Sequence, residues 1–102
     1  MKPIFDNSSL IDWLGRQDPK AEYDYVDGAV CMVARYLQFR GIKGAGCDSD
    51  FAYIPGAIGP LDLPPAWDEI AKDRPWTFGA ALSRARARLT TIKHKTIDEV
   101  AA

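Results

Sequence analysis

Apolar residues recur at helical spacing close to the start of the chain. Leu10, Trp13 and Leu14 stand at positions i, i+3 and i+4, which places them on one face of a helix. Ser8 or Ser9 can cap this helix, because a hydroxyl oxygen accepts a hydrogen bond from a free backbone N–H group of the first turn. The pattern therefore predicts an amphipathic first helix.

A second helix is predicted over residues 29–39, where apolar side chains cover nearly the whole circumference up to Arg35. A helix that is apolar on all sides is usually central, so we expect this segment to form the core of the domain. Asp27 is the expected N-cap. Gly41 is expected to end the helix, because the residue after a helix often adopts the left-handed conformation that glycine favours.

Polar and aromatic residues alternate over residues 22–26, and a period of two is typical of a strand. Tyr23 and Tyr25 would then share one side of that strand. Residues 51–54 are its candidate partner. Because two strands alone are only marginally stable, we expect a short two-stranded element packed against helices.

Two further helices are predicted in the last third of the chain. Trp67 lies on the apolar face of a short third helix, which follows a pair of prolines, and proline is favoured in the first turn of a helix. Thr77 can cap a fourth helix that begins at the next residue. Residues 89–92 either continue this helix or leave it, and Thr96 begins a capping-box pattern that predicts a final short helix.

Length and composition are those of one globular domain. The chain has 102 residues, of which 47% are apolar and 26% are charged, close to the average for folded domains. We therefore predict a single domain over residues 1–102, mainly α or small α+β, built around the helix over 29–39. A signal peptide and a membrane-spanning stretch are not expected, so the predicted location is the cytoplasm, with no membrane partner.

The two cysteines, Cys31 and Cys47, are too few for a disulfide scaffold and wrongly spaced for a zinc site. In the cytoplasm their thiols are expected to be reduced. Cys31 and His94 could form the catalytic pair of a thiol hydrolase, but apolar neighbours favour a buried structural cysteine. Asp48 and Asp50 do not fit a calcium-binding loop and are interpreted as turn formers. No metal, cofactor or phosphate-binding loop is predicted, and an enzymatic role is not favoured.

Charge is unevenly distributed, although the net charge is −1. Residues 1–73 carry seven Lys and Arg against twelve Asp and Glu, whereas residues 74–97 carry six basic residues and no acidic one. On a continuous helix Arg84, Arg88 and Lys95 would lie along one face and could bind phosphates of a nucleic acid. A low isoelectric point disfavours that role, and pairing with the acidic part of the chain is the alternative.

Aromatic residues are the other candidates for binding. Tyr23, Tyr25 and Trp76 belong either to the core or to a surface patch, since aromatic side chains are enriched at the energetic centres of protein interfaces. The sequence does not separate these two interpretations.

Several short stretches resemble those of uncharacterised proteins from bacterial, prophage and phage genomes, over about residues 10–88. They are Tyr23-Asp24-Tyr25 with Asp27, the segment from Cys31 through Ala34-Arg35-Tyr36-Leu37 to Arg40-Gly41, Pro64-Pro65-Ala66-Trp67, and Thr77-Phe78-Gly79-Ala80-Ala81-Leu82. The resemblance implies an origin in a mobile genetic element and no catalytic residues.

Taken together, these features predict a non-enzymatic protein–protein interaction module, such as a phage or prophage accessory protein that binds a host or virion component. The alternatives are a weak nucleic-acid binder that uses Arg84, Arg88 and Lys95, and the less favoured hydrolase of Cys31 and His94. The sequence predicts neither the identity of the partner nor the oligomeric state.

Overall fold

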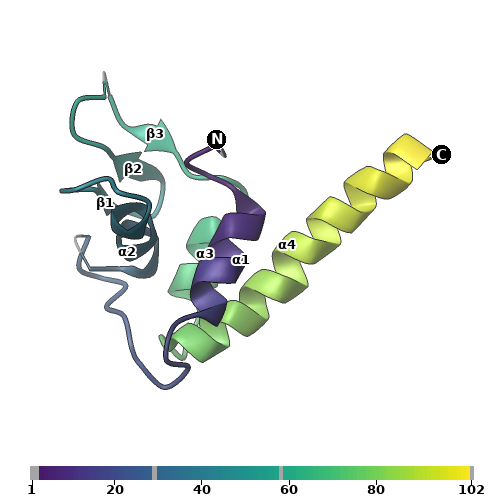
Figure 1. Ribbon diagram of the computed structural model, residues 1–102, viewed down its shortest axis with the longest axis horizontal. Helices are drawn as coiled ribbons and strands as arrows, with labels where there is room; N and C mark the ends of the chain where they lie inside the picture. Colours follow the sequence, from purple (N-terminus) through teal and green to yellow (C-terminus); the bar gives the residue numbers. More distant parts are fainter. Residues whose placement is uncertain (1–2, 29, 58, 102) are drawn as a thin grey trace.

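Four helices and a small antiparallel sheet make up the described part of the chain (Figure 1). The computed structural model describes residues 3–28, 30–57 and 59–101, with side chains up to residue 89. In chain order the elements are α1 (Asn7–Gly15), α2 (Met32–Phe39), β1 (Gly46–Cys47), β2 (Phe51–Tyr53), β3 (Leu61–Asp62), α3 (Trp67–Lys72) and α4 (Phe78–Ala101). The prediction of a small α+β domain is confirmed, whereas the predictions of a mainly α fold and of a two-stranded element are wrong.

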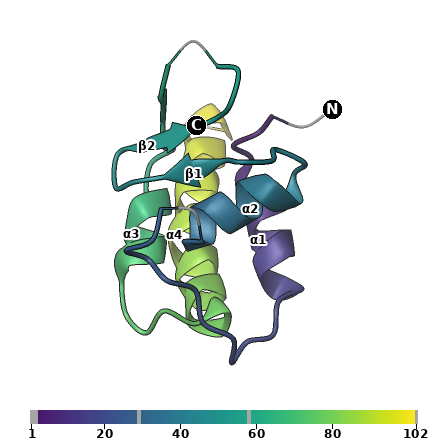
Figure 2. The same ribbon diagram turned by 90° about the vertical axis from the view of Figure 1, so that its left-hand side faces the viewer.

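Helix α2 is central, as its all-round apolar pattern predicts. It lies across the other helices, with α1 and α3 on either side of α4 (Figure 2), and five of its eight residues are buried. The helix begins at Met32, and its N-cap is Cys31 instead of the predicted Asp27. Ahead of the helix, the Val30 N–H donates to the Asp27 carbonyl at 3.1 Å. Gly41 follows the helix at φ +92°, in the conformation predicted for it.

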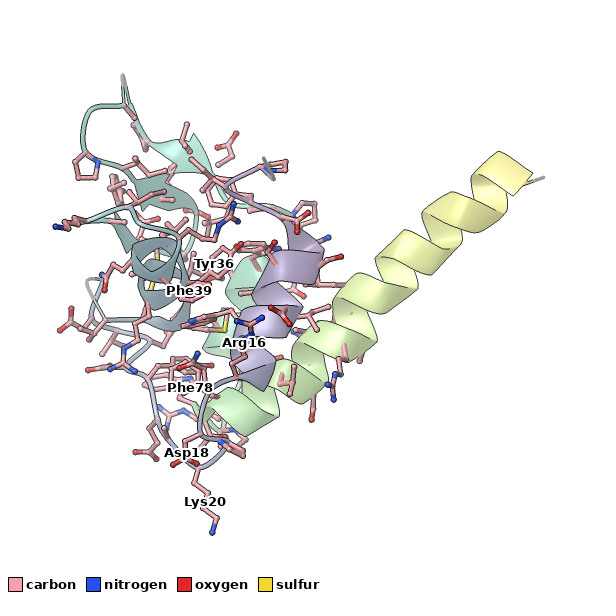
Figure 3. The ribbon with its side chains drawn as sticks, in the orientation of Figure 1. Arg16, Asp18, Lys20, Tyr36, Phe39 and Phe78 are labelled. Carbon is pink, nitrogen blue, oxygen red and sulfur yellow. A yellow bond between two sulfur atoms is a disulfide. The ribbon has the colours of Figure 1, made fainter. Side chains whose placement is uncertain are left out.

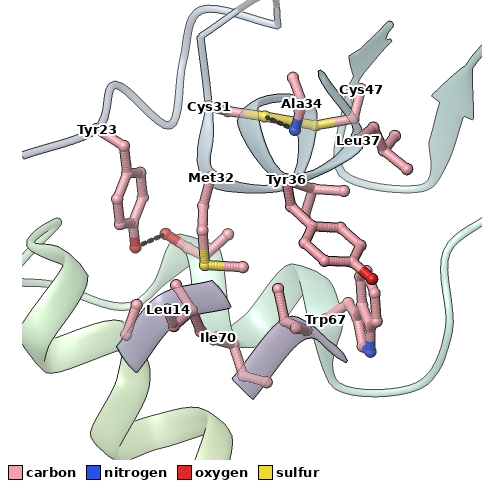
Figure 4. Close-up of a cluster of buried hydrophobic side chains, with 14 of the residues drawn as sticks. Leu14, Tyr23, Cys31, Met32, Ala34, Tyr36, Leu37, Cys47, Trp67 and Ile70 are labelled. Atoms are coloured by element: carbon pink, nitrogen blue, oxygen red, sulfur yellow. Dashed lines mark hydrogen bonds between the residues drawn. A yellow bond between two sulfur atoms is a disulfide. The ribbon is translucent and has the colours of Figure 1, made fainter. Parts of the chain in front are cut away.

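Aromatic rings join the helices into one core (Figure 4). Trp13 of α1 packs edge-on against Tyr36 of α2 and Phe78 of α4, with ring centroids 5.7 and 5.6 Å apart. Tyr36 in turn packs against Trp67 of α3 at 5.5 Å. Trp67 is fully buried, and its indole N–H donates to the side-chain oxygen of Asn7 at 2.7 Å. These contacts bury much of the aromatic area of a short chain.

The sheet differs most from the sequence-based prediction. Strand β2 lies between β1 and β3 and pairs with both in antiparallel fashion. Asp48 forms the turn between β1 and β2, because its Oδ1 accepts hydrogen bonds from the N–H groups of Asp50 and Phe51, as in an Asx turn. Local turn chemistry therefore pairs β2 with its neighbour in sequence and not with residues 22–26.

Residues 22–26 do not form a strand. Glu22 makes an isolated bridge to Thr77, and the Tyr23 N–H donates to the Trp76 carbonyl at 3.1 Å. The alternating pattern reflects one buried tyrosine and one half-buried tyrosine in an irregular segment. The prediction that this segment pairs with residues 51–54 is wrong.

The N-cap of α1 differs from the predicted one, whereas that of α4 agrees with it. Asp6, and neither Ser8 nor Ser9, caps α1, and its carboxylate accepts from the Ser9 N–H at 2.8 Å. Thr77 caps α4 as predicted, through a hydrogen bond from the Ala80 N–H at 3.3 Å.

Helix α4 is continuous to Ala101, so the prediction that a separate helix starts at Thr96 is wrong. The segment contains no proline or glycine after its first turn that would interrupt it. Its C-terminal half extends beyond the rest of the domain (Figure 1). Within the described residues, no helix combines the length and the apolar character needed to cross a membrane.

Candidate protein-binding face

Tyr25 and Trp76 form an aromatic pair at the surface. Their ring centroids lie 5.6 Å apart at an interplanar angle of 44°, and both side chains are half-buried. The guanidinium of Arg74 lies over the Trp76 ring, 4.6 Å from its centroid, in a cation–π contact. The three residues together present aromatic and charged groups at the surface.

The aromatic pair is anchored to α3 at two points. The Tyr25 hydroxyl donates to Asp68 Oδ1 at 2.7 Å, and the Trp76 indole N–H donates to the Lys72 carbonyl at 2.9 Å. Because both anchors belong to one short helix, the two rings are held in a fixed relative position before any partner binds.

A cavity of about 480 Å³ opens beside Tyr25. Its lining combines an apolar wall with acidic side chains and the two cysteines. The lining residues are Tyr25, Val26, Gly28, Cys31, Val33, Cys47, Asp48, Ser49, Leu63, Asp68 and Ala71. We call it the acidic cavity, since no Lys or Arg is found among these described residues.

The environment of the acidic cavity changes the pKa of the Tyr25 hydroxyl. Burial, the hydrogen bond to Asp68 and the charges of Asp68, Asp48 and Asp50 raise the pKa of Tyr25 to about 12. The pKa of Asp48 is lowered, chiefly by hydrogen bonds from the Tyr53 hydroxyl and the backbone of the turn. Asp48 is therefore ionised and Tyr25 protonated at neutral pH, and the cavity carries negative charge.

Trp76 borders a second cavity, of about 460 Å³, lined by Glu22, Tyr23, Arg74, Pro75 and Trp76. The aromatic pair therefore stands between two hollows. Val26, on the rim of the acidic cavity, is 77% exposed. We define the binding face as Tyr25, Val26, Arg74 and Trp76 together with the two cavities.

Tyr23, the third predicted aromatic candidate, belongs to the core. Its ring is 4% exposed, and its hydroxyl donates to the Ala71 carbonyl at 2.7 Å (Figure 4). Burial is the main cause of its raised pKa. Of the predicted aromatic candidates, the structure therefore brings Tyr25 and Trp76 together at the surface and places Tyr23 beneath them.

Arg84, Arg88 and Lys95 make up the predicted basic stripe, and its described side chains, those of Arg84 and Arg88, are bound within the domain. Arg84 donates to the carbonyls of Ile70 and Pro75 at 2.9 and 3.2 Å and to the Tyr23 hydroxyl at 3.0 Å. Its guanidinium thus satisfies one carbonyl near the end of α3 and one in the segment between α3 and α4.

Arg88 pairs with acidic residues of the same region. Its guanidinium lies 2.5 Å from the Asp73 carboxylate and 3.8 Å from that of Glu69, and the hydrogen bond from Arg88 lowers the pKa of Asp73. The Lys95 side chain lies outside the described residues. The described contacts correspond to the alternative of pairing with the acidic part of the chain.

Cys31 and Cys47 form a disulfide that links the N-cap of α2 to β1 (Figure 4). The prediction of reduced thiols is therefore wrong for this structure. Spacing could not reveal the pair, because the two residues meet only after β1 folds back beside the start of α2. Gly28 permits this approach: its carbonyl accepts from the Cys47 N–H at 2.9 Å, and a Cβ at Gly28 would lie 2.8 Å from the Cys47 carbonyl oxygen.

The disulfide also changes the hydrolase hypothesis. Cys31 is bonded and 2% exposed, so it offers no thiolate in this state. The His94 side chain lies outside the described residues. In the described part of the chain, no group of three His, Cys, Asp or Glu side chains is placed to hold a metal ion.

Comparisons with known proteins gave no match. No family model matches it, and no match to a curated protein or to a solved structure was found. The resemblance to phage and prophage proteins remains a prediction, and the evidence on function is the geometry of the binding face.

Proposed function

We propose that this domain is a non-enzymatic protein-binding module and that the binding face is where its partner docks. The observation that carries the proposal is the Tyr25–Trp76 pair, anchored to α3 and placed between two cavities. Tyr, Trp and Arg are the residues most enriched at the energetic centres of interfaces. Side chains that are already fixed lose little entropy on binding.

The size of the domain is compatible with such a role. A standard interface covers about 800 Å² on each partner, and the accessible surface of this chain is 6333 Å². One docking event would then cover about an eighth of the surface. A face that spans both cavities and the aromatic pair has room for an interface of this class.

The predicted setting completes the proposal. A phage or prophage origin favours a host or virion protein as the partner. A cytoplasmic location is the predicted compartment. The Cys31–Cys47 disulfide bears on this prediction, because glutathione and thioredoxin keep most cytosolic thiols reduced. Alkylation of free thiols in freshly lysed cells distinguishes the two states and thereby tests the location.

The test is capture of partners from host lysate by tagged protein, after nuclease treatment and at moderate salt. We expect a stoichiometric protein partner for the wild type and loss of it for Trp76→Ala. Phe39→Ala is the matched control, because Phe39 is an aromatic residue that is 56% exposed and lines neither cavity.

Equal capture by wild type and Trp76→Ala would contradict the proposed face. Retention of nucleic acid at low salt, abolished by nuclease, would instead support the alternative of nucleic-acid binding, since phosphate contacts weaken steeply with salt.

A further inference from the structure

We infer that the acidic cavity receives a basic side chain, arginine or lysine, from the docked partner. This inference rests on the proposed function and names the partner chemistry that fits one half of the binding face. Its basis is the combination of an apolar wall and unbalanced negative charge in one hollow beside the aromatic pair.

The wall of the cavity suits the stem of such a side chain. Val26 and Leu63 supply accessible aliphatic surface, and buried Val33 and Ala71 lie beneath it. Arginine and lysine bury their methylene groups against apolar surface while the charged head reaches a polar group. A volume of about 480 Å³ lies within the range of ligand-binding pockets, so one long side chain and part of its backbone can enter.

The charged head would meet Asp68. One oxygen of this carboxylate, Oδ1, accepts from the Tyr25 hydroxyl, and in the described part of the chain no hydrogen-bond or ion-pair partner is found for Oδ2. Asp68 is half-buried, so a cation placed against it is screened less than at the open surface. Asp48, which also lines the cavity, adds a second negative charge.

Other carboxylates of this region differ from those of the acidic cavity, because they are paired with an arginine. Asp73 and Glu69, close to Asp68 in sequence, are already paired with Arg88. The acidic cavity differs because its lining holds carboxylates and no basic residue of the described chain. An anionic ligand would be repelled, and an apolar one would cover charged oxygens without compensating them.

The probe for the test is butylguanidinium, which carries the head and stem of an arginine side chain. Butyramide and butyrate are its neutral and anionic controls. In ¹H–¹⁵N correlation spectra we expect saturable shifts of the Gly28, Val33 and Ser49 amides with butylguanidinium, weaker at higher salt, and no saturable shift with either control.

Asp68→Asn should raise the Kd for butylguanidinium about fivefold, because it removes the charge and keeps the shape. Asp18→Asn is the matched control. Asp18 is an exposed aspartate that accepts from the Lys20 N–H, and it lies in the loop after α1, outside the cavity lining (Figure 3). The spectra of both variants report whether the fold is kept.

If Asp68→Asn fails to fold, the wild-type comparison of the three probes and its salt dependence decide the question. Absence of saturable shifts, equal binding of butyramide, or an unchanged Kd in a folded Asp68→Asn variant would overturn the inference. The proposed function fails separately, through equal partner capture by wild type and Trp76→Ala. Capture that depends on Trp76, with no guanidinium binding, would leave the binding face standing and remove the basic side chain from it.

Discussion

The arginines of α4 and the aspartates of the acidic cavity differ in whether the folded chain provides them with partners of opposite charge. The arginines of α4 are the more conspicuous in the sequence, yet Arg84 and Arg88 are bound to carbonyls, a phenol and carboxylates of the same molecule. Asp48 and Asp68 look like ordinary turn and helix residues, yet they line a cavity with no basic neighbour in its described lining. A cluster of charges in the sequence therefore does not by itself indicate a binding site. What matters is which charged side chains are left without a partner of opposite charge after folding.

The largest loss of stability is expected from Arg84→Ala. The substitution leaves two carbonyls and the Tyr23 hydroxyl without their charged donor, so the free energy of unfolding should fall by about 3 kcal/mol. Urea denaturation measures it, with exposed Arg86→Ala as the control on the same helix. A loss no larger than that of the control would show that Arg84 is available for a ligand after all.

Reduction of the Cys31–Cys47 disulfide, beside the acidic cavity, is expected to lower the free energy of unfolding by a similar amount. Cys31 and Cys47 are separated by 16 positions, and closing a loop of about that length stabilises a fold by about 3 kcal/mol. Urea midpoints with and without dithiothreitol measure the loss. A Cys31→Ala, Cys47→Ala protein should not respond to the reductant. Identical midpoints for the wild type under both conditions would contradict the linkage.

Trp76→Ala should affect binding more than folding. The side chain is half-buried and makes one hydrogen bond to Lys72, so its stability loss should be smaller than that of Arg84→Ala. Its loss from the binding face should weaken partner affinity about tenfold or more, as measured by calorimetry with the purified partner. The reverse order, a large loss of stability with unchanged affinity, would assign Trp76 to the core.

The smallest effect concerns Tyr25 at alkaline pH. Its pKa is raised to about 12 from 10.0, so between these values the unfolded chain releases the phenolic proton while the folded protein keeps it. The contribution of Tyr25 to stability is therefore lost as pH rises from about 10 to about 12. Tyr25→Phe should flatten the decline of the urea midpoint over that range. Parallel declines in both proteins would contradict the raised pKa of Tyr25.

Helices were predictable because their signals are local. The apolar stripe of α1, the all-round apolar pattern of α2 and the Thr77 cap of α4 each lie within one element. The caps of α1 and α2 were missed, because neighbouring residues such as Asp6 and Ser9 compete for the same N–H groups and sequence does not rank them.

The sheet and the binding face depended on long-range contacts. Asp48 was correctly interpreted as a turn former, but its place beside Asp68 follows from the packing of β1 against α2 and of α3 beneath them. The Cys31–Cys47 disulfide has the same origin. Tyr25 and Trp76 carried a signal as aromatic residues, although only the folded chain separates them from buried Tyr23.

Hydrogen exchange of the complex with the captured partner would decide which region binds. We expect exchange to slow at residues 22–28, 46–49 and 72–76, which carry the aromatic pair and the two cavities, and to be unchanged in α1. Protection confined to α4 from residue 84 onward would place the partner on the basic stripe and contradict the binding face.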